Sequence, residues 1–125
     1  MHITITIGRV SVAAELHDTP AAKKVAVALP IRASLSTWGD EIYFPIPVDA
    51  SLDDSARSVV NLGDLGYWPP GKAFCIFFGQ TPVSSPGEIR PASPVNIIGR
   101  VVGDATRFKA VLREKEVLLE ATPAS

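Results

Sequence analysis

Hydrophobic and polar residues alternate in the first stretch of the chain. Ile3, Ile5 and Ile7 fall on one face of an extended segment, and threonines fall between them. Gly8-Arg9 follows as a two-residue connection with glycine first, which favours a type II′ β-hairpin. The expected cross-strand pairs are Ile7 with Val10, Ile5 with Val12, and Ile3 with Ala14.

A second pair of alternating segments, residues 31–38 and 41–46, predicts another hairpin around Gly39-Asp40. The expected pairs are Trp38 with Glu41, Thr37 with Ile42, Ser36 with Tyr43, and Leu35 with Phe44. One face of this hairpin is apolar and predicts core. The other face carries polar residues and large aromatic side chains, which need either a covering loop or a ligand.

The most apolar segment runs from residue 66 to 79 and reads GYWPPGKAFCIFFG. Residues 73–78 are apolar on both alternating faces, which is typical of a strand covered on both sides and therefore central in its sheet. Before it, Pro69-Pro70-Gly71 predicts a type II turn in which Gly71 supplies the positive φ.

Helical signals are fewer than strand signals. Asp18-Thr19-Pro20 predicts a helix start, with Ala22, Val25, Ala26 and Leu29 inward, and Pro30 ends that helix. Further expected elements are a loop with a helical turn over 48–61, a long functional or mobile loop over 79–94, a strand over 95–102, a short helix capped by Asp104 with Phe108, Val111 and Leu112 inward, and a closing strand over 117–121.

Composition adds limits to this β-rich pattern. The 125 residues include eleven prolines and nine glycines, which favour many turns, and the length predicts one domain over residues 1–125. A net charge of −1 gives no electrostatic footprint for nucleic acid or an anionic membrane. With no apolar run of about 20 residues and no signal-peptide pattern, we expect a cytoplasmic protein without a membrane span.

The residue types also limit the chemistry. Cys75 is the single cysteine and lies in the apolar strand, so a buried, inert thiol is expected. His2 and His17 are the only histidines and are expected at the surface, which leaves no pattern for a nucleophilic triad or a metal site. We therefore expect neither a metal nor a cofactor.

Aromatic residues beside turns indicate a ligand-facing surface. Glu41 lies between Trp38 and Tyr43 and is either an acid or base with a raised pKa or a solvated cross-strand partner. Phe77 and Phe78 are open to a second interpretation as plain core. The candidate ligand-binding residues are Trp38, Glu41, Tyr43, Tyr67, Trp68, Phe77, Phe78, Gln80, Thr81, Ser93 and Asn96.

Three segments, TWGDEIYF (37–44), GDLGYWPPGKAFCIFFGQTP (63–82) and PASPVNIIGRV (91–101), resemble the small prokaryotic cyclophilin-like proteins, long catalogued as a domain of unknown function. The resemblance implies a mainly β fold, a closed eight-stranded β-barrel with short capping helices. True cyclophilins hold an arginine within an F-H-R-x-[IV]-x-x-F-x-x-Q-G-type motif, and this sequence has no such string; the nearest counterparts of that arginine are Arg57, Arg90 and Arg100.

Three functions follow as expectations. The first is a non-enzymatic module that binds a proline-containing peptide or a small molecule. The second is a peptidyl-prolyl isomerase with an atypical site, in which Arg57 or Arg90 polarises the prolyl amide. The third is an accessory subunit of an amide-cleaving enzyme, which would require a protein partner. The catalytic residues of any reaction are not readable from the sequence.

Overall fold

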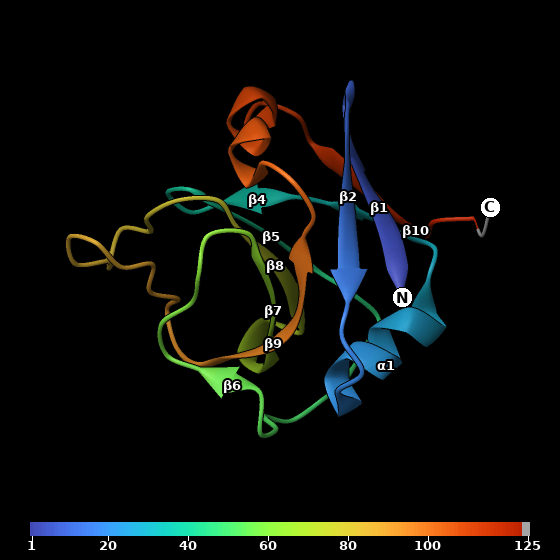
Figure 1. Cartoon of the computed structure of the whole chain (residues 1–125), viewed down its shortest axis with the longest axis horizontal. Helices are drawn as coiled ribbons and strands as arrows, with labels where there is room; N and C mark the ends of the chain where they lie inside the picture. The colour runs from blue at the N-terminus through green and yellow to red at the C-terminus, as the bar shows by residue number, and fades with distance from the viewer. Residues whose placement is uncertain (124–125) are drawn as a thin grey trace.

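The structure of the protein is a computed structural model that describes residues 1–123. Within them, one curved sheet of ten strands carries an α-helix and two 3₁₀ helices (Figure 1). The strands are β1 (His2–Ile7), β2 (Val10–Leu16), β3 (Ile31–Ser34), β4 (Ser36–Thr37), β5 (Glu41–Pro45), β6 (Ala56–Arg57), β7 (Asp64–Trp68), β8 (Ala73–Phe77), β9 (Val95–Val101) and β10 (Glu116–Ala121). The helices are α1 (Pro20–Ala28), η1 (Pro69–Gly71) and η2 (Ala105–Val111).

The sheet curls round without closing through hydrogen bonds. Its strand order is β3-β10-β1-β2-β9-β7-β8-β5-β4, and β6 pairs with β9 outside this path. The two end strands, β3 and β4, are consecutive in the chain and are separated only by Leu35, whose N–H donates to the carbonyl of Lys115. The expected closed barrel of eight strands is therefore wrong: the interruption at Leu35 leaves two short strands, and β6 adds another.

Both predicted hairpins are present because alternation and turn chemistry act locally. All three pairs expected across Gly8-Arg9 are found, and Gly8 has a φ of +57°. In the second hairpin Ser36 pairs with Tyr43, and Thr37 with Ile42. The expected pairing of Leu35 with Phe44 is wrong, because Leu35 bonds to Lys115 on the other side of the interruption.

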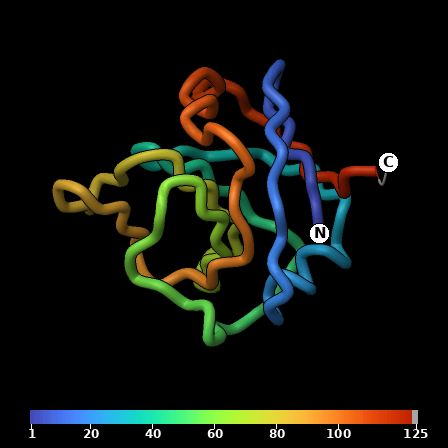
Figure 2. Tube along the Cα trace, in the orientation of Figure 1, coloured from blue at the N-terminus to red at the C-terminus, as the bar shows by residue number. Residues whose placement is uncertain are grey.

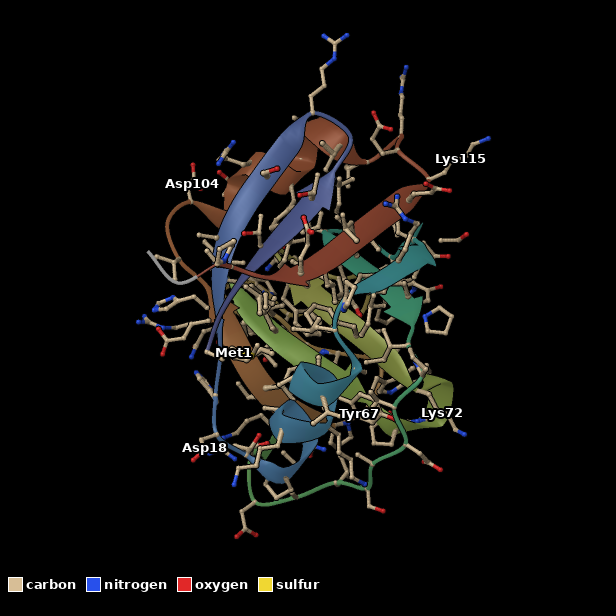
Figure 3. All side chains as sticks on the ribbon, turned by 90° about the vertical axis from the view of Figure 1, so that its right-hand side faces the viewer. Met1, Asp18, Tyr67, Lys72, Asp104 and Lys115 are labelled. Carbon is tan, nitrogen blue, oxygen red and sulfur yellow. The ribbon has the colours of Figure 1, made fainter. Side chains whose placement is uncertain are left out.

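The predicted central strand is confirmed. β8 lies between β5 and β7, and all five of its residues are buried. Phe74 and Ile76 belong to the main core inside the curved sheet, whose packed side chains fill the centre of the molecule in Figure 3. Alternate β8 residues contribute to a second, smaller cluster on the outer face, consisting of Val60, Ala73, Cys75, Phe77 and Val95. The outer face of this strand is thus covered by side chains and loops, not by a second sheet.

Three local predictions are wrong. Residues 69–71 form a 3₁₀ helix instead of a type II turn, and Lys72, with a φ of +47°, takes the left-handed conformation expected of Gly71. Leu112 is exposed, whereas Phe108 and Val111 are buried as expected. The segment 48–61 contains β6 and, instead of a helix, a single turn in which the Ala56 N–H donates to the Asp53 carbonyl at 3.0 Å.

Helix α1 covers one open end of the curved sheet (Figure 1). The Thr19 side chain accepts from the N–H of Ala22, and Pro20 occupies the first turn, as predicted. Ala21, Ala22 and Val25 are buried against the main core. At the other end, the Asp104 side chain caps η2 by accepting from Thr106 N–H.

Candidate functional site: an aromatic pocket on the outer face of the sheet

A pocket of about 160 Å³ opens on the outer face of β5, β8, β7 and β9. Its lining comes from the second hairpin, from the end of β7, and from the segment that leads into β9. The lining residues are Trp38, Glu41, Tyr43, Trp68, Pro91, Ala92 and Val95. Apart from the Glu41 carboxyl group and the polar edges of the aromatic rings, these side chains are apolar.

Glu41 reaches the pocket because β5 alternates. Ile42 and Phe44 enter the main core, so Glu41 and Tyr43 take the opposite face of the strand. The turn at Gly39-Asp40 fixes the start of the strand: the N–H of Trp38 donates to the Glu41 carbonyl at 2.9 Å, and the N–H of Glu41 donates to the Trp38 carbonyl at 3.2 Å.

The Glu41 side chain is a carboxyl group in an apolar setting. The residue is 6% exposed. Burial raises the pKa of its carboxyl group to about 7, and a hydrogen bond from the Cys75 thiol opposes part of that rise. Burial, together with the nearby Glu41 carboxyl group, raises the pKa of the Cys75 thiol well above its usual value. Cys75 therefore remains a neutral thiol, as expected from the sequence.

The Trp68 ring is held from two sides. Its indole N–H donates to Ser93 Oγ at 2.7 Å, which ties the end of β7 to the loop before β9. On the other side, Gly71 lies so close that a β-carbon there would approach the ring at 2.9 Å. The absence of a side chain at Gly71 thus leaves room for the indole ring, and Gly71 does not supply a positive φ.

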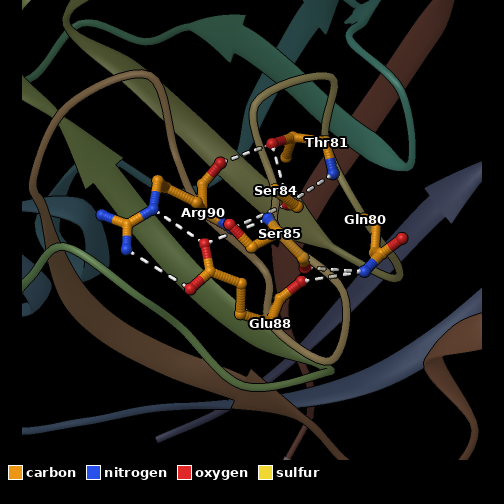
Figure 4. Close-up of polar contacts among 6 residues, drawn as sticks. All are labelled: Gln80, Thr81, Ser84, Ser85, Glu88 and Arg90. Carbon is orange, nitrogen blue, oxygen red and sulfur yellow. Dashed lines mark hydrogen bonds and ion pairs between the residues drawn. The ribbon is translucent and has the colours of Figure 1, made fainter.

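The wall formed by Pro91 and Ala92 is part of the long loop between β8 and β9, which extends away from the sheet in Figure 2. Polar contacts organise the base of this loop (Figure 4). The buried Thr81 hydroxyl donates to the Arg90 carbonyl, and Ser84 Oγ accepts from the N–H groups of Thr81 and Arg90 at 3.0 and 2.9 Å. Arg90 Nε also donates to Glu88 Oε2 at 2.8 Å.

The structure brings four of the predicted ligand-binding residues together around the pocket: Trp38, Glu41, Tyr43 and Trp68. Phe77 lies in the outer cluster, close to Cys75 and Val95. Ser93 contributes indirectly, because its hydroxyl oxygen accepts from the indole N–H of Trp68. Thr81 and Gln80 bind within the loop, Gln80 donating to the carbonyls of Ser85 and Glu88.

Seven predicted residues lie outside the pocket lining, and three of these are held in the protein interior. Tyr67 is buried in the main core and its hydroxyl donates to the Val48 carbonyl at 2.6 Å. Phe78 packs in the same core against Phe108, with ring centroids 6.1 Å apart. Asn96 is fully buried, accepting from Asp53 N–H and donating to the Ser51 carbonyl.

Pro91, Ala92 and Val95 line the pocket but were not predicted to do so. For Val95 a signal existed, because it begins the strand predicted over 95–102 and could have been assigned to its outer face by alternation. Pro91 and Ala92 carried no such signal, since their position depends on how the long loop folds back on the sheet.

The two arginines considered for an isomerase site do not line the pocket. Arg57 donates to the carbonyls of Asp54 and Ala56 at 3.1 and 2.7 Å, and Arg90 is paired with Glu88. Among residues 1–123, no group of three or more His, Cys, Asp or Glu side chains is placed to hold a metal ion. Nor does any helix in this range have the length and apolar character needed to cross a membrane.

Fold and site together define a small, mainly β protein with a ring-sized aromatic pocket on the outer face of one curved sheet. The family model described as "Cyclophilin-like" matches residues 1–120, and the chain belongs to that family. No curated protein matches the chain.

Solved structures that resemble the chain include two that differ widely in sequence identity. One is the solution structure of the hypothetical protein AF2241 from Archaeoglobus fulgidus, which is 40% identical, with a TM-score of 0.80, over 98% of this chain and 95% of that one. The other is McbB in complex with tryptophan, which is 14% identical, with a TM-score of 0.73, over 98% of this chain and 45% of that one. The second likeness extends to the fold alone.

Proposed function

We propose that the protein binds a small molecule, or one side chain of a peptide, whose single ring enters the pocket. The convergence of Trp38, Tyr43 and Trp68 around a buried carboxyl group carries this proposal. A concave, mostly apolar site with a small number of polar groups is the usual form of a small-molecule site.

The size of the pocket limits the ligand. A cavity of about 150 Å³ lined by apolar side chains accepts benzene, and this pocket measures about 160 Å³. A phenyl group or a proline ring therefore fits, whereas a larger fused system would project from the mouth. McbB, which shares the fold, was solved in complex with tryptophan.

Both tryptophans of the chain line the pocket, so its intrinsic fluorescence reports on occupancy directly. Titration with benzyl alcohol is expected to change the emission in a saturable way, with a Kd on the order of 1 mM, equivalent to about −4 kcal/mol. Substitution Ala92→Phe places a ring in the pocket from an exposed loop position and is expected to weaken binding at least tenfold.

Ala110→Phe is the matched control, because Ala110 is exposed on η2 and outside the pocket lining. The proposal would be refuted if the emission of the unaltered protein changed with none of the probes, which are benzyl alcohol, proline-containing peptides and other single-ring compounds. A protease-coupled assay on an X-Pro peptide separates binding from isomerisation, since binding alone leaves the rate at its uncatalysed value.

A further inference from the structure

The polar group of the pocket is acidic and has incomplete hydrogen bonding. Cys75 provides one thiol proton for two acceptors, the Glu41 carboxyl group and the Ala73 carbonyl, which lies 3.8 Å from the sulfur. Backbone bonding of Glu41 is already satisfied by Trp38. The carboxyl group therefore retains acceptor capacity directed at the space in which a ligand would lie.

Within residues 1–123, no cationic side chain lines this pocket. The titratable neighbours of Glu41 are Tyr43 on its own strand and Cys75 on β8, while β7, β9 and the loop contribute only Trp68, Val95, Pro91 and Ala92. The nearby charges are paired elsewhere: Asp40 lies 3.9 Å from Lys109, and Arg90 is bound by Glu88. A buried carboxylate without a positive partner is unfavourable, and a cationic ligand would relieve that penalty.

The aromatic walls of the pocket also favour a positively charged ligand. Trp38, Tyr43 and Trp68 surround the space beside Glu41, and the faces of such rings attract an ammonium group. An anionic ligand would instead be repelled by the ionised Glu41 carboxylate at close range.

We propose that the pocket selects a ligand that carries one ring and a protonated amine, with the amine directed at the Glu41 carboxylate and the ring between the aromatic walls. This inference rests on the proposed function of the pocket, and it specifies the chemical class of the ligand.

Benzylamine and benzyl alcohol form a matched pair of probes that differ in the charge of one group. Benzylamine remains protonated from about pH 6 to about pH 8. Over this range a carboxyl group with a pKa of about 7 changes from roughly one tenth to roughly nine tenths ionised. Benzylamine affinity, followed by tryptophan emission, is therefore expected to rise about ninefold, while that of benzyl alcohol changes less than about twofold.

At about pH 8 the unaltered protein is expected to bind benzylamine at least tenfold more tightly than benzyl alcohol. The Glu41→Gln variant is expected to reduce this ratio to about one and to remove the pH dependence. Because the pH series uses the unaltered protein, the test does not depend on the variant being folded.

Equal affinities for the two probes at about pH 8, or tighter binding of benzoate, would overturn the amine preference and leave ring binding intact. Binding of neither probe would overturn both proposals. A ninefold rise for benzylamine alone, lost in Glu41→Gln, would establish the preference.

Discussion

Glu41 is the residue on which the chemistry of the pocket depends most. Its carboxyl group is held against an apolar floor by the alternation of β5, and burial raises its pKa to about 7. In the unfolded chain the pKa returns to its ordinary value near 4.5. The folded protein thus binds this proton more tightly than the unfolded chain does, so the free energy of unfolding falls as pH rises between these two values.

Replacing Glu41 with glutamine removes the charge and nearly keeps the shape. Well below pH 4.5 the carboxyl group is protonated in both folded and unfolded chains, and the substitution is expected to change stability little. At about pH 8 the free energy of unfolding of the variant is expected to exceed that of the unaltered protein by about 1–3 kcal/mol. Each unit of pKa shift corresponds to roughly 1.4 kcal/mol. Urea denaturation at both pH values measures the difference.

Glu120→Gln serves as the control, because Glu120 is exposed on β10 and should give no comparable dependence on pH. If the Glu41→Gln variant loses the same stability at both pH values, the hydrogen bond between Cys75 and the Glu41 carboxyl group, and not the burial of its charge, has the larger effect on stability.

Alternation in the sequence identified which side chains of the second hairpin leave the core, and Trp38, Glu41 and Tyr43 do line the pocket. The same rule applies to Tyr67 and Trp68, which are neighbours on β7 and therefore point to opposite faces. Treating them as a pair placed Tyr67 in the candidate site, although its ring belongs to the main core.

The loop between β8 and β9 is the element that completes the pocket. Phe78 of this loop belongs to the main core and Ile89 packs against the outer cluster, while polar bonds around Thr81, Ser84 and Arg90 hold its base (Figure 4). Thr81 is the buried member of this group. The ion pair between Arg90 and Glu88 is partly exposed and contributes less, as is usual for such pairs.

Substitution Thr81→Val keeps the volume of the side chain and removes its hydroxyl group. The Arg90 carbonyl then loses its donor, which is expected to destabilise the protein by about 1–2 kcal/mol. Because the next residue is Pro91, benzyl alcohol binding is expected to weaken as well. Denaturation and tryptophan emission measure the two effects.

Thr6→Val provides the comparison, since the Thr6 hydroxyl makes an exposed hydrogen bond to Ser11 within the hairpin of β1 and β2. If both variants lose the same stability and neither alters ligand binding, the loop is not positioned by Thr81.

Elements that depend on local signals were predictable, and elements that depend on distant pairing were not. The capped start of α1 and both hairpin turns follow from neighbouring residues. The interruption at Leu35 does not follow from neighbouring residues. It arises because β3 pairs with β10, whereas β4, directly after Leu35, pairs with β5. Nor could the 3₁₀ helix over 69–71 be read from its prolines, which suit that conformation and a type II turn equally.

At the scale of the whole molecule, one sheet supports two separate apolar clusters. β8 contributes alternate side chains to each, and β9 joins this half of the sheet to β2. The junction is tight at Gly99, where a β-carbon would collide with the Glu15 carbonyl oxygen. That oxygen belongs to backbone, so neither strand can yield easily.

Gly99→Ala is expected to destabilise the protein by more than about 2 kcal/mol, because the added methyl group forces β2 and β9 apart. Thermal or urea unfolding measures the loss. Gly87→Ala sets the scale for a purely conformational effect: its methyl group meets nothing within 4 Å, and the expected cost of about 1 kcal/mol comes from a φ of +82°. A smaller loss for Gly99→Ala than for Gly87→Ala would contradict the tight junction.

The floor and the wall of the pocket come from different parts of the chain. The floor is built on strands that also form the main core, and mutation there affects folding. The wall belongs to one connecting segment, which is fastened by polar bonds around Thr81 at its base, by the pairing of Ile89 with Val60, and by the bond between Ser93 and Trp68. Exchanging that segment between relatives is thus a route by which evolution or a protein engineer can diversify ligand choice on an unchanged scaffold.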